Sequence, residues 1–432
     1  MVLYSRFMNY IFLIITVLLL VGSCTPLAQS SLNSESNPKA LRLIDIGYEP
    51  EIKTIQMHPE NAPQLPAVTP FGKWDLLLQF DDLRPQGDTY YAKVIHCNYD
   101  WTKSDLPDLD FMTAYNEFPI TNNEFSVDTH ISYVHYWFPV PPVKLPGNYV
   151  LLVYRGSNKD DIILTRRFMV YANQVTFTSE GNLLGPSYLA DLNQQINFTI
   201  NYKDLTILNP LLDVHVNISQ NHRWDNVIKD VKPSFVREIE KELEYRFFEE
   251  SKMFSGGSEF RFFDLRSLEN PGQNVATVVK TVKPFEAYIA KDKPRGHEAY
   301  SQYLDLNGAF NIDNFDYRDL AFANYANVNF ALASPPVNGD VFVAGAFNNW
   351  NLDDVNKMQY DSANNMYTAR ILLKQGWYDY QYLVRSPDLP YYYFEGSHFE
   401  TENYYEIFVY HKPYQPRADL LIGYIRLDKN PR

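Results

Sequence analysis

The chain has 432 residues, a formal net charge of −14 and an aromatic content of 16%. It is too long for one hydrophobic core of ordinary size, so roughly two to four domains are expected. Its acidic residues are dispersed, which argues against a phosphate-binding surface, and we expect no nucleic-acid partner. The 33 Tyr and 28 Phe favour half-buried, pleated surfaces and predict an all-β fold.

The N-terminus carries the pattern of an export signal. Arg6 is followed by an apolar run over residues 10–21 and by small residues before Cys24. The run is short for a membrane span, so residues 1–23 are predicted to be a signal peptide. The letters "VGSC" resemble the lipobox of bacterial lipoproteins, which predicts that Cys24 becomes the lipid-modified first residue of the mature chain. Ordinary cleavage after Ser23 is the alternative.

A polar stretch over residues 24–43 follows the signal. It is rich in Ser and Asn, as expected of a flexible tether between an anchor and a folded body. Cys97 is the only other cysteine, so acylation of Cys24 would leave it without a partner for a disulfide. The folded part must then be stabilised by core packing, and we expect it to begin near Ile44.

Three sets of short apolar runs, separated by turn residues, come next. They predict tandem β-sandwiches of immunoglobulin-like or early-Set-like type. We expect an N-terminal sandwich over residues 44–171, a middle β-domain over 172–324, and a C-terminal sandwich over 325–432. Within the middle domain, the polar segment 291–317 is predicted to be a linker or an insertion.

One charged stretch could be read as a helix or as strands. The letters "REIEKELEYRFFEE" have the composition of a helix, but alternation in "LEYRF" and "EFRFFDL", on either side of Gly256-Gly257, favours two strands joined by a loop. In the last set, "GWYDYQYLV" places Tyr378, Tyr380 and Tyr382 on one face of a strand.

The sequence lacks the signatures of common enzymes. A zinc hydrolase needs two His four apart on a helix, whereas His130 and His135 lie five apart in a strand-like stretch. There is no Gly-x-Ser-x-Gly elbow and no phosphate loop. We therefore predict a non-enzymatic protein with no cofactor and no metal site.

Two pairs of neighbouring residues have reactive side chains. His96 and Cys97 point to opposite faces of a strand, so we interpret Cys97 as a buried structural cysteine rather than a nucleophile. Asp81 and Asp82 end an apolar strand, where a turn-forming or hydrogen-bonding role is favoured over cation binding or acid–base chemistry.

The stretch "VFVAGAFNNW", residues 341–350, resembles the early-Set sandwich modules related to starch- and glycogen-binding domains. In that family the Trp of the Asn-Trp element, here Trp350, lies in the core or near the binding face, and further exposed aromatic residues stack on sugar rings. Phe347, Asn349, Trp350 and Tyr380 are therefore candidates for either core packing or glycan contact. For Phe347 and Trp350 the core is the favoured interpretation.

A wider resemblance covers nearly the whole mature chain. It rests on ordered segments: "LLLQFDDL", "YYAKVIHCNYDW", "HYWFPVP", "PGNYVLLVY", "FSGGSEFRFFDLRS", "VFVAGAFNNW" and "FETENYYEIFVYHKPYQPRADLLIGY". Together they resemble the plug protein family of the Bacteroidota type IX secretion system. The resemblance implies an all-β periplasmic protein that binds the outer-membrane translocon barrel and closes its periplasmic mouth in the unloaded state. It carries over no catalytic residue.

Two functions follow as hypotheses. The first is the translocon plug, located in the periplasm and associated with the outer membrane through a lipidated Cys24. The alternative is an envelope glycan-binding lipoprotein that uses the C-terminal module. A glycan partner is the less favoured of the two.

Overall fold

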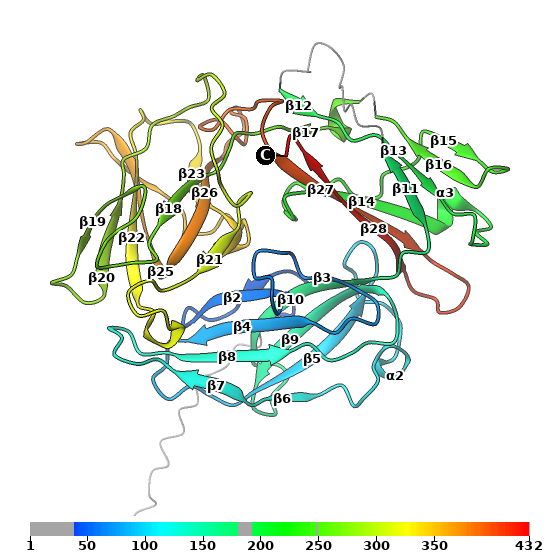
Figure 1. Ribbon diagram of the computed structural model, residues 1–432, viewed down its shortest axis with the longest axis horizontal. Helices are drawn as coiled ribbons and strands as arrows, with labels where there is room; N and C mark the ends of the chain where they lie inside the picture. The colour runs from blue at the N-terminus through cyan, green and yellow to red at the C-terminus, as the bar shows by residue number, and fades with distance from the viewer. Residues whose placement is uncertain (1–38, 180–191, 248, 432) are drawn as a thin grey trace, which may run out of the picture. The chain divides into compact units, whose positions relative to one another are not determined.

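The computed structural model describes residues 39–179, 192–247 and 249–431 (Figure 1). The predicted signal peptide and Cys24 lie outside these residues. Almost all regular elements of the described part are strands, and the all-β prediction is confirmed. No helix in this part of the chain is long and apolar enough to cross a membrane.

The first sandwich packs two sheets against each other. One sheet has the order β1 (Ile46–Gly47), β10 (Ile162–Tyr171), β9 (Gly147–Arg155), β5 (Tyr90–Cys97) and β6 (Phe118–Ile120), with β3 (Val68–Pro70) parallel to β10. The other has the order β2 (Ile52–Pro59), β4 (Leu76–Asp82), β8 (Val134–Pro139) and β7 (Asn122–Phe125). Alternate side chains of both sheets, with Phe111 of the short helix α2 (Asp108–Phe111), fill the core.

The second sandwich is built from two distant parts of the chain. Its first sheet has the order β11 (Thr176–Ser179), β13 (Phe198–Asn201), β16 (Glu242–Tyr245) and β15 (Phe235–Arg237). Its second has the order β14 (Val214–Gln220), β27 (Asn403–His411) and β28 (Leu420–Lys429), with α3 (Pro210–Asp213) before β14. A short pair, β12 (Asn193–Gln194) with β17 (Phe254–Ser255), lies beside them. One core joins both sheets.

The third sandwich lies between β17 and β27 in the sequence. One sheet has the order β19 (Val275–Val279), β20 (Phe285–Ile289), β22 (Tyr325–Leu332), β25 (Met366–Lys374) and β24 (Gln359–Asp361). The other has the order β18 (Arg261–Asp264), β26 (Gly376–Arg385) and β21 (Phe310–Ile312), and β23 (Asp340–Ala344) also pairs with β26. Their shared core contains Tyr378, Tyr380 and Tyr382, which are buried on one face of β26 as the alternation predicts.

The third sandwich is therefore an insertion in the second. Figure 1 shows β27 and β28, in red, beside β14, in green, and the pairing of β14 with β27 is continuous from Val214–His411 to Gln220–Tyr405. This pairing crosses the predicted boundary at residue 325, because strands far apart in sequence complete one sheet. The segment 291–317 is not a linker, since its strand β21 pairs with β26.

The charged stretch near residue 240 forms strands. "LEYRF" contributes to β16 and "EFRFFDL" to β18, so the strand prediction is confirmed, and the described residues of the charged stretch form no α-helix, only the start of a 3-10 turn at Glu250–Lys252. The two strands do not pair with each other. β16 belongs to the second sandwich and β18 to the third, because the loop around Gly256-Gly257 is the connection between the two sandwiches.

Candidate functional site at the junction of the three sandwiches

A buried ion pair joins the first sandwich to the third. Asp81 on β4 is fully buried, and it accepts hydrogen bonds from Lys374 Nζ at 2.8 Å, Tyr325 Oη at 2.7 Å and His135 Nδ1 at 2.6 Å. Burial opposes ionisation of Asp81, but the ammonium of Lys374 and the hydrogen bond from His135 outweigh it and hold the pKa of the carboxyl below its usual range. We call Asp81, Lys374, Tyr325 and His135 the buried latch.

A second polar contact joins the second sandwich to the third. The guanidinium of Arg223, only 2% exposed, lies 3.8 Å from the centroid of the Trp350 ring and forms a bidentate ion pair with Asp225. Burial opposes the charge of Arg223, but Tyr392 and Asp225 outweigh it and raise the pKa of the guanidinium. Such a desolvated cation–π contact contributes about 2 kcal/mol. One face of the indole is thus covered by an arginine.

An apolar cluster joins the first sandwich to the second. Arg167 lies over the rings of Trp101 and Trp224, at 4.6 and 5.2 Å from their centroids. Around them pack buried side chains of β9 and β10 from the first sandwich and of β27 and β28 from the second. Burial lowers the pKa of Arg167. All three pairs of sandwiches therefore contact one another through desolvated groups.

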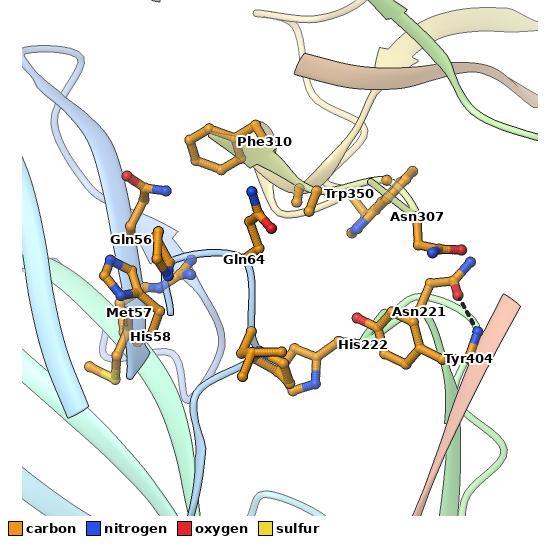
Figure 2. Close-up of a pocket in the computed structure, with 17 residues that line it drawn as sticks. Gln56, Met57, His58, Gln64, Asn221, His222, Asn307, Phe310, Trp350 and Tyr404 are labelled. Carbon is orange, nitrogen blue, oxygen red and sulfur yellow. Dashed lines mark hydrogen bonds between the residues drawn. The ribbon is translucent and has the colours of Figure 1, made fainter. Parts of the chain in front are cut away.

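A cavity of about 100 Å³ lies where the three sandwiches meet (Figure 2). The first sandwich provides Gln56 and His58 of β2, the loop 63–66, and Arg166. The second provides Asn221, His222 and Tyr404, and the third provides Trp350 with residues 307–310. In the view of Figure 2, Gln64 lies between Gln56 on one wall and Asn307 on the other. Among the residues that the structure describes, the lining contains no Asp, Glu or Lys.

The four residues predicted for core or glycan contact do not form one site. Tyr380 is 1% exposed in the core of the third sandwich, where its hydroxyl donates to Asp292 at 2.6 Å. Phe347 packs edge-on against Tyr378. Asn349 adopts the left-handed conformation, with φ at 54°, and accepts a hydrogen bond from Arg166.

Trp350 has a different role from its neighbours. It is 6% exposed, packs against Phe260 and Leu383, and lies under Arg223. Its indole therefore connects two sandwiches rather than offering an open platform to a sugar ring. The predicted lipidation site, Cys24, lies outside the described residues.

The other reactive residues of the sequence are separated. Asp82 points away from Asp81 and accepts from Tyr90 Oη at 2.7 Å. The ring of His130 stacks on Phe285 at 3.9 Å, whereas His135 binds Asp81. Among the described residues no group of three or more His, Cys, Asp or Glu could hold a metal ion.

Cys97 and His96 are both buried. The Cys97 thiol contacts the carbonyl oxygen of Ile95 and not the imidazole of His96. Burial raises the pKa of the Cys97 thiol to about 12 and lowers the pKa of His96 to about 4. A thiol with that pKa is almost entirely protonated at neutral pH and is a poor nucleophile. The geometry agrees with a structural cysteine.

Sequence reasoning missed Arg223 and Lys374, which hold the sandwiches together. A signal exists for Lys374, because a lysine within the apolar run "ILLKQG" is expected to need a buried partner. No local signal identifies that partner as Asp81, which lies 293 residues away.

The fold and its junction define a class: an all-β protein of three interlocked β-sandwiches. Residues 52–172 match the family described as the type 9 secretion system plug protein, 1st domain. The chain thus carries the first domain of these plug proteins, which indicates a role in type 9 secretion and an envelope location.

A solved structure resembles almost the whole chain. The crystal structure of a hypothetical protein from Parabacteroides merdae superposes with a TM-score of 0.84 and 28% sequence identity, covering 90% of this chain and 100% of that one. A marsupial T cell receptor aligns with a TM-score of 0.15 and 8% identity, and a score this low shows no shared fold. The comparison with curated proteins gave no match.

Proposed function

We propose that this protein is a non-enzymatic plug, which binds the outer-membrane translocon barrel of type IX secretion from the periplasmic side and seals it in the unloaded state. The observation that carries the proposal is the match of residues 52–172 to the first domain of the plug family. Similarity to one solved structure, that of a hypothetical protein, covers 90% of the chain and shows that the fold is shared beyond that domain.

The junction supports the mechanical part of the proposal. A seal must keep its shape against a wide opening, so its parts must not slide past one another. Asp81 with Lys374, and Arg223 with Trp350, place desolvated charged groups across two of the sandwich contacts. Sliding the first sandwich along the third would leave Asp81 and Lys374 buried without their partners, which costs about 3–5 kcal/mol. The sandwiches therefore move as one body when the plug seats.

A lipid anchor completes the proposal. Acylation of Cys24 would confine the protein to a membrane surface, and the tether over residues 24–43 would let the folded body reach a nearby barrel. Mass spectrometry of the mature N-terminus should show a diacylated or triacylated Cys24. A Cys24→Ser chain should be released from washed membranes, and an unmodified Cys24 would refute the anchor.

Sealing is tested by permeability. Deleting the gene should admit a large hydrophilic dye into the periplasm, and this leak should disappear when the translocon barrel is deleted as well. A tagged copy should co-purify with the unloaded barrel. Absence of the chain from every purified translocon state, or a leak that is independent of the barrel, would refute the proposal.

A further inference from the structure

One end of the second sandwich carries an exposed apolar loop. Residues 205–212, "LTILNPLL", contain five Leu or Ile and no charged side chain. Leu205 is partly buried against the core and holds the loop in place. Leu208, Leu211 and Leu212, the last two in α3, are 92%, 48% and 70% exposed. A single exposed leucine is common, but three within one short loop form a patch that indicates a contact with something outside the chain.

The loop between β27 and β28 lies beside this patch. Its first residue, Lys412, donates through its backbone N–H to the carbonyl oxygen of Asp213, the last residue of α3, at 3.0 Å (Figure 1). Tyr414 is 80% exposed, and the guanidinium of Arg417 lies 5.5 Å from the centroid of its ring. Residues 412–418 contain these two cations and no acidic residue. We call the exposed apolar side chains of the two loops the apolar tip: Leu208, Leu211, Leu212 and Tyr414.

The hairpin turn between β15 and β16 borders the apolar tip. Lys241 donates through Nζ to the carbonyl oxygen of Leu205 at 3.1 Å, which places the turn beside the loop. Ile239 in this turn is 94% exposed, but Glu238 and Glu240 flank it. Carboxylates favour water over an apolar phase, so the apolar tip ends at this turn.

The composition of the apolar tip favours a lipid bilayer over a protein partner. The residues that dominate protein interfaces are enriched in Trp, Tyr and Arg, and Leu is under-represented among them, whereas three of the four tip residues are Leu. Tyrosine and long cationic side chains beside such leucines suit a membrane surface, because they reach the headgroups. Lys412 and Arg417 also give this end a positive rim in a chain of net charge −14, which complements lipid phosphates.

A membrane lies within reach of this end if Cys24 is acylated. The described part begins at Lys39, 15 residues after Cys24. A stretch of that length spans at most about 50 Å, so the proposed anchor confines the folded body near a bilayer. A tether of this length does not determine which face of the body is turned toward the lipid. Contact through the apolar tip would determine it.

We propose that the apolar tip inserts into the headgroup region of a phospholipid membrane. Leu208 and Leu212 contact the acyl chains, Tyr414 lies at the headgroups, and Lys412 and Arg417 pair with lipid phosphates. The second sandwich is thereby turned toward the bilayer. The inference adds an orientation to the proposed lipid anchor, but the contact itself needs neither acylation nor the translocon.

The test is flotation of the mature Cys24→Ser chain, which lacks the anchor, with vesicles of phosphatidylethanolamine and phosphatidylglycerol. The chain should float with the vesicles. Leu208→Ser with Leu212→Ser should lower the partition coefficient about tenfold or more, since two apolar side chains leave the lipid. Leu109→Ser is the matched control: Leu109 is 75% exposed on the first sandwich, between two aspartates, and its variant should float like the Cys24→Ser chain.

A second pair of substitutions tests the positive rim. Lys412→Gln with Arg417→Gln should remove the preference for these vesicles over vesicles of phosphatidylcholine, which is about fivefold per cation, and leave weak binding to both. All the replaced side chains of the tip and its rim are exposed, so the urea midpoints of the variants should stay unchanged.

Two results would overturn the proposal: no flotation of the Cys24→Ser chain, or equal flotation of the leucine variant and the Leu109→Ser control. Loss of co-purification with the translocon barrel in the leucine variant, without a change in flotation, would also overturn it, because the tip would then contact protein. Absence of flotation with intact co-purification would refute the membrane contact and leave the plug proposal standing.

Discussion

Removing the acidic member of the buried latch should uncouple the first and third sandwiches. In Asp81→Asn the side chain can no longer balance the ammonium of Lys374, whose side chain is 3% exposed. Breaking a buried ion pair from one side costs about 3–5 kcal/mol, since the remaining charge stays desolvated. The hydrogen bonds from Tyr325 and His135 weaken at the same time, so we expect a loss in this range.

Urea unfolding of the mature chain, followed by tryptophan fluorescence, measures this loss. A double variant, Asp81→Val with Lys374→Met, should recover part of it, because apolar residues can replace a buried ion pair without a net penalty. Asp340→Asn is the control, since Asp340 pairs with Lys357 and Arg385 at the surface, and its unfolding midpoint should stay unchanged. A loss below about 1 kcal/mol in Asp81→Asn, or a double variant no more stable than it, would refute the reasoning.

Three further outcomes are expected. Trp350→Ala should lower the free energy of unfolding by about 3–5 kcal/mol in the same assay, because it opens a cavity and uncovers Arg223. In a Cys24→Ser chain, Cys97 should not react with Ellman's reagent at pH 8 until denaturant is added, since burial raises the pKa of its thiol to about 12. Rapid reaction of the native chain would contradict this.

The third outcome concerns acid. Burial opposes ionisation of Glu406, but hydrogen bonds from His222, Tyr424 and Ser219 outweigh it and lower the pKa of the carboxyl, as the latch does for Asp81. Stability from such groups is fully present above their unfolded pKa of about 4 and is lost as pH falls through the lower folded pKa. Urea midpoints should therefore drop below about pH 4, and less so in Asp81→Asn. Equal drops in both chains would count against the role of Asp81.

Local alternation predicted the strands well. The period-two pattern placed Tyr378, Tyr380 and Tyr382 on one buried face, and the strands around Gly256-Gly257 emerged in spite of a helix-like composition. The reason is that a strand's buried face is recorded in its own residues. The favoured core position of Trp350 came instead from the resemblance to early-Set modules, because this residue follows a turn after β23 and lies outside any strand.

What joins the sandwiches could not be predicted. Arg223 reaches Trp350 and Lys374 reaches Asp81 only after sheets distant in sequence have come together. The pairing of β27 with β14 also has no signal in the local sequence, since both strands look like ordinary apolar runs. The junction cavity is formed by these long-range contacts, so no sequence motif predicts that His58 and Asn307 line it.

The return of the last strands determines when the protein can finish folding. A chain is synthesised from its N-terminus onward, so β14 has an unpaired edge until β27, near the C-terminus, is available to pair with it. The third sandwich has all of its own strands before that moment. The pairing of β27 with β14 therefore completes the fold, and a chain cut before β27 would present an open, aggregation-prone sheet edge.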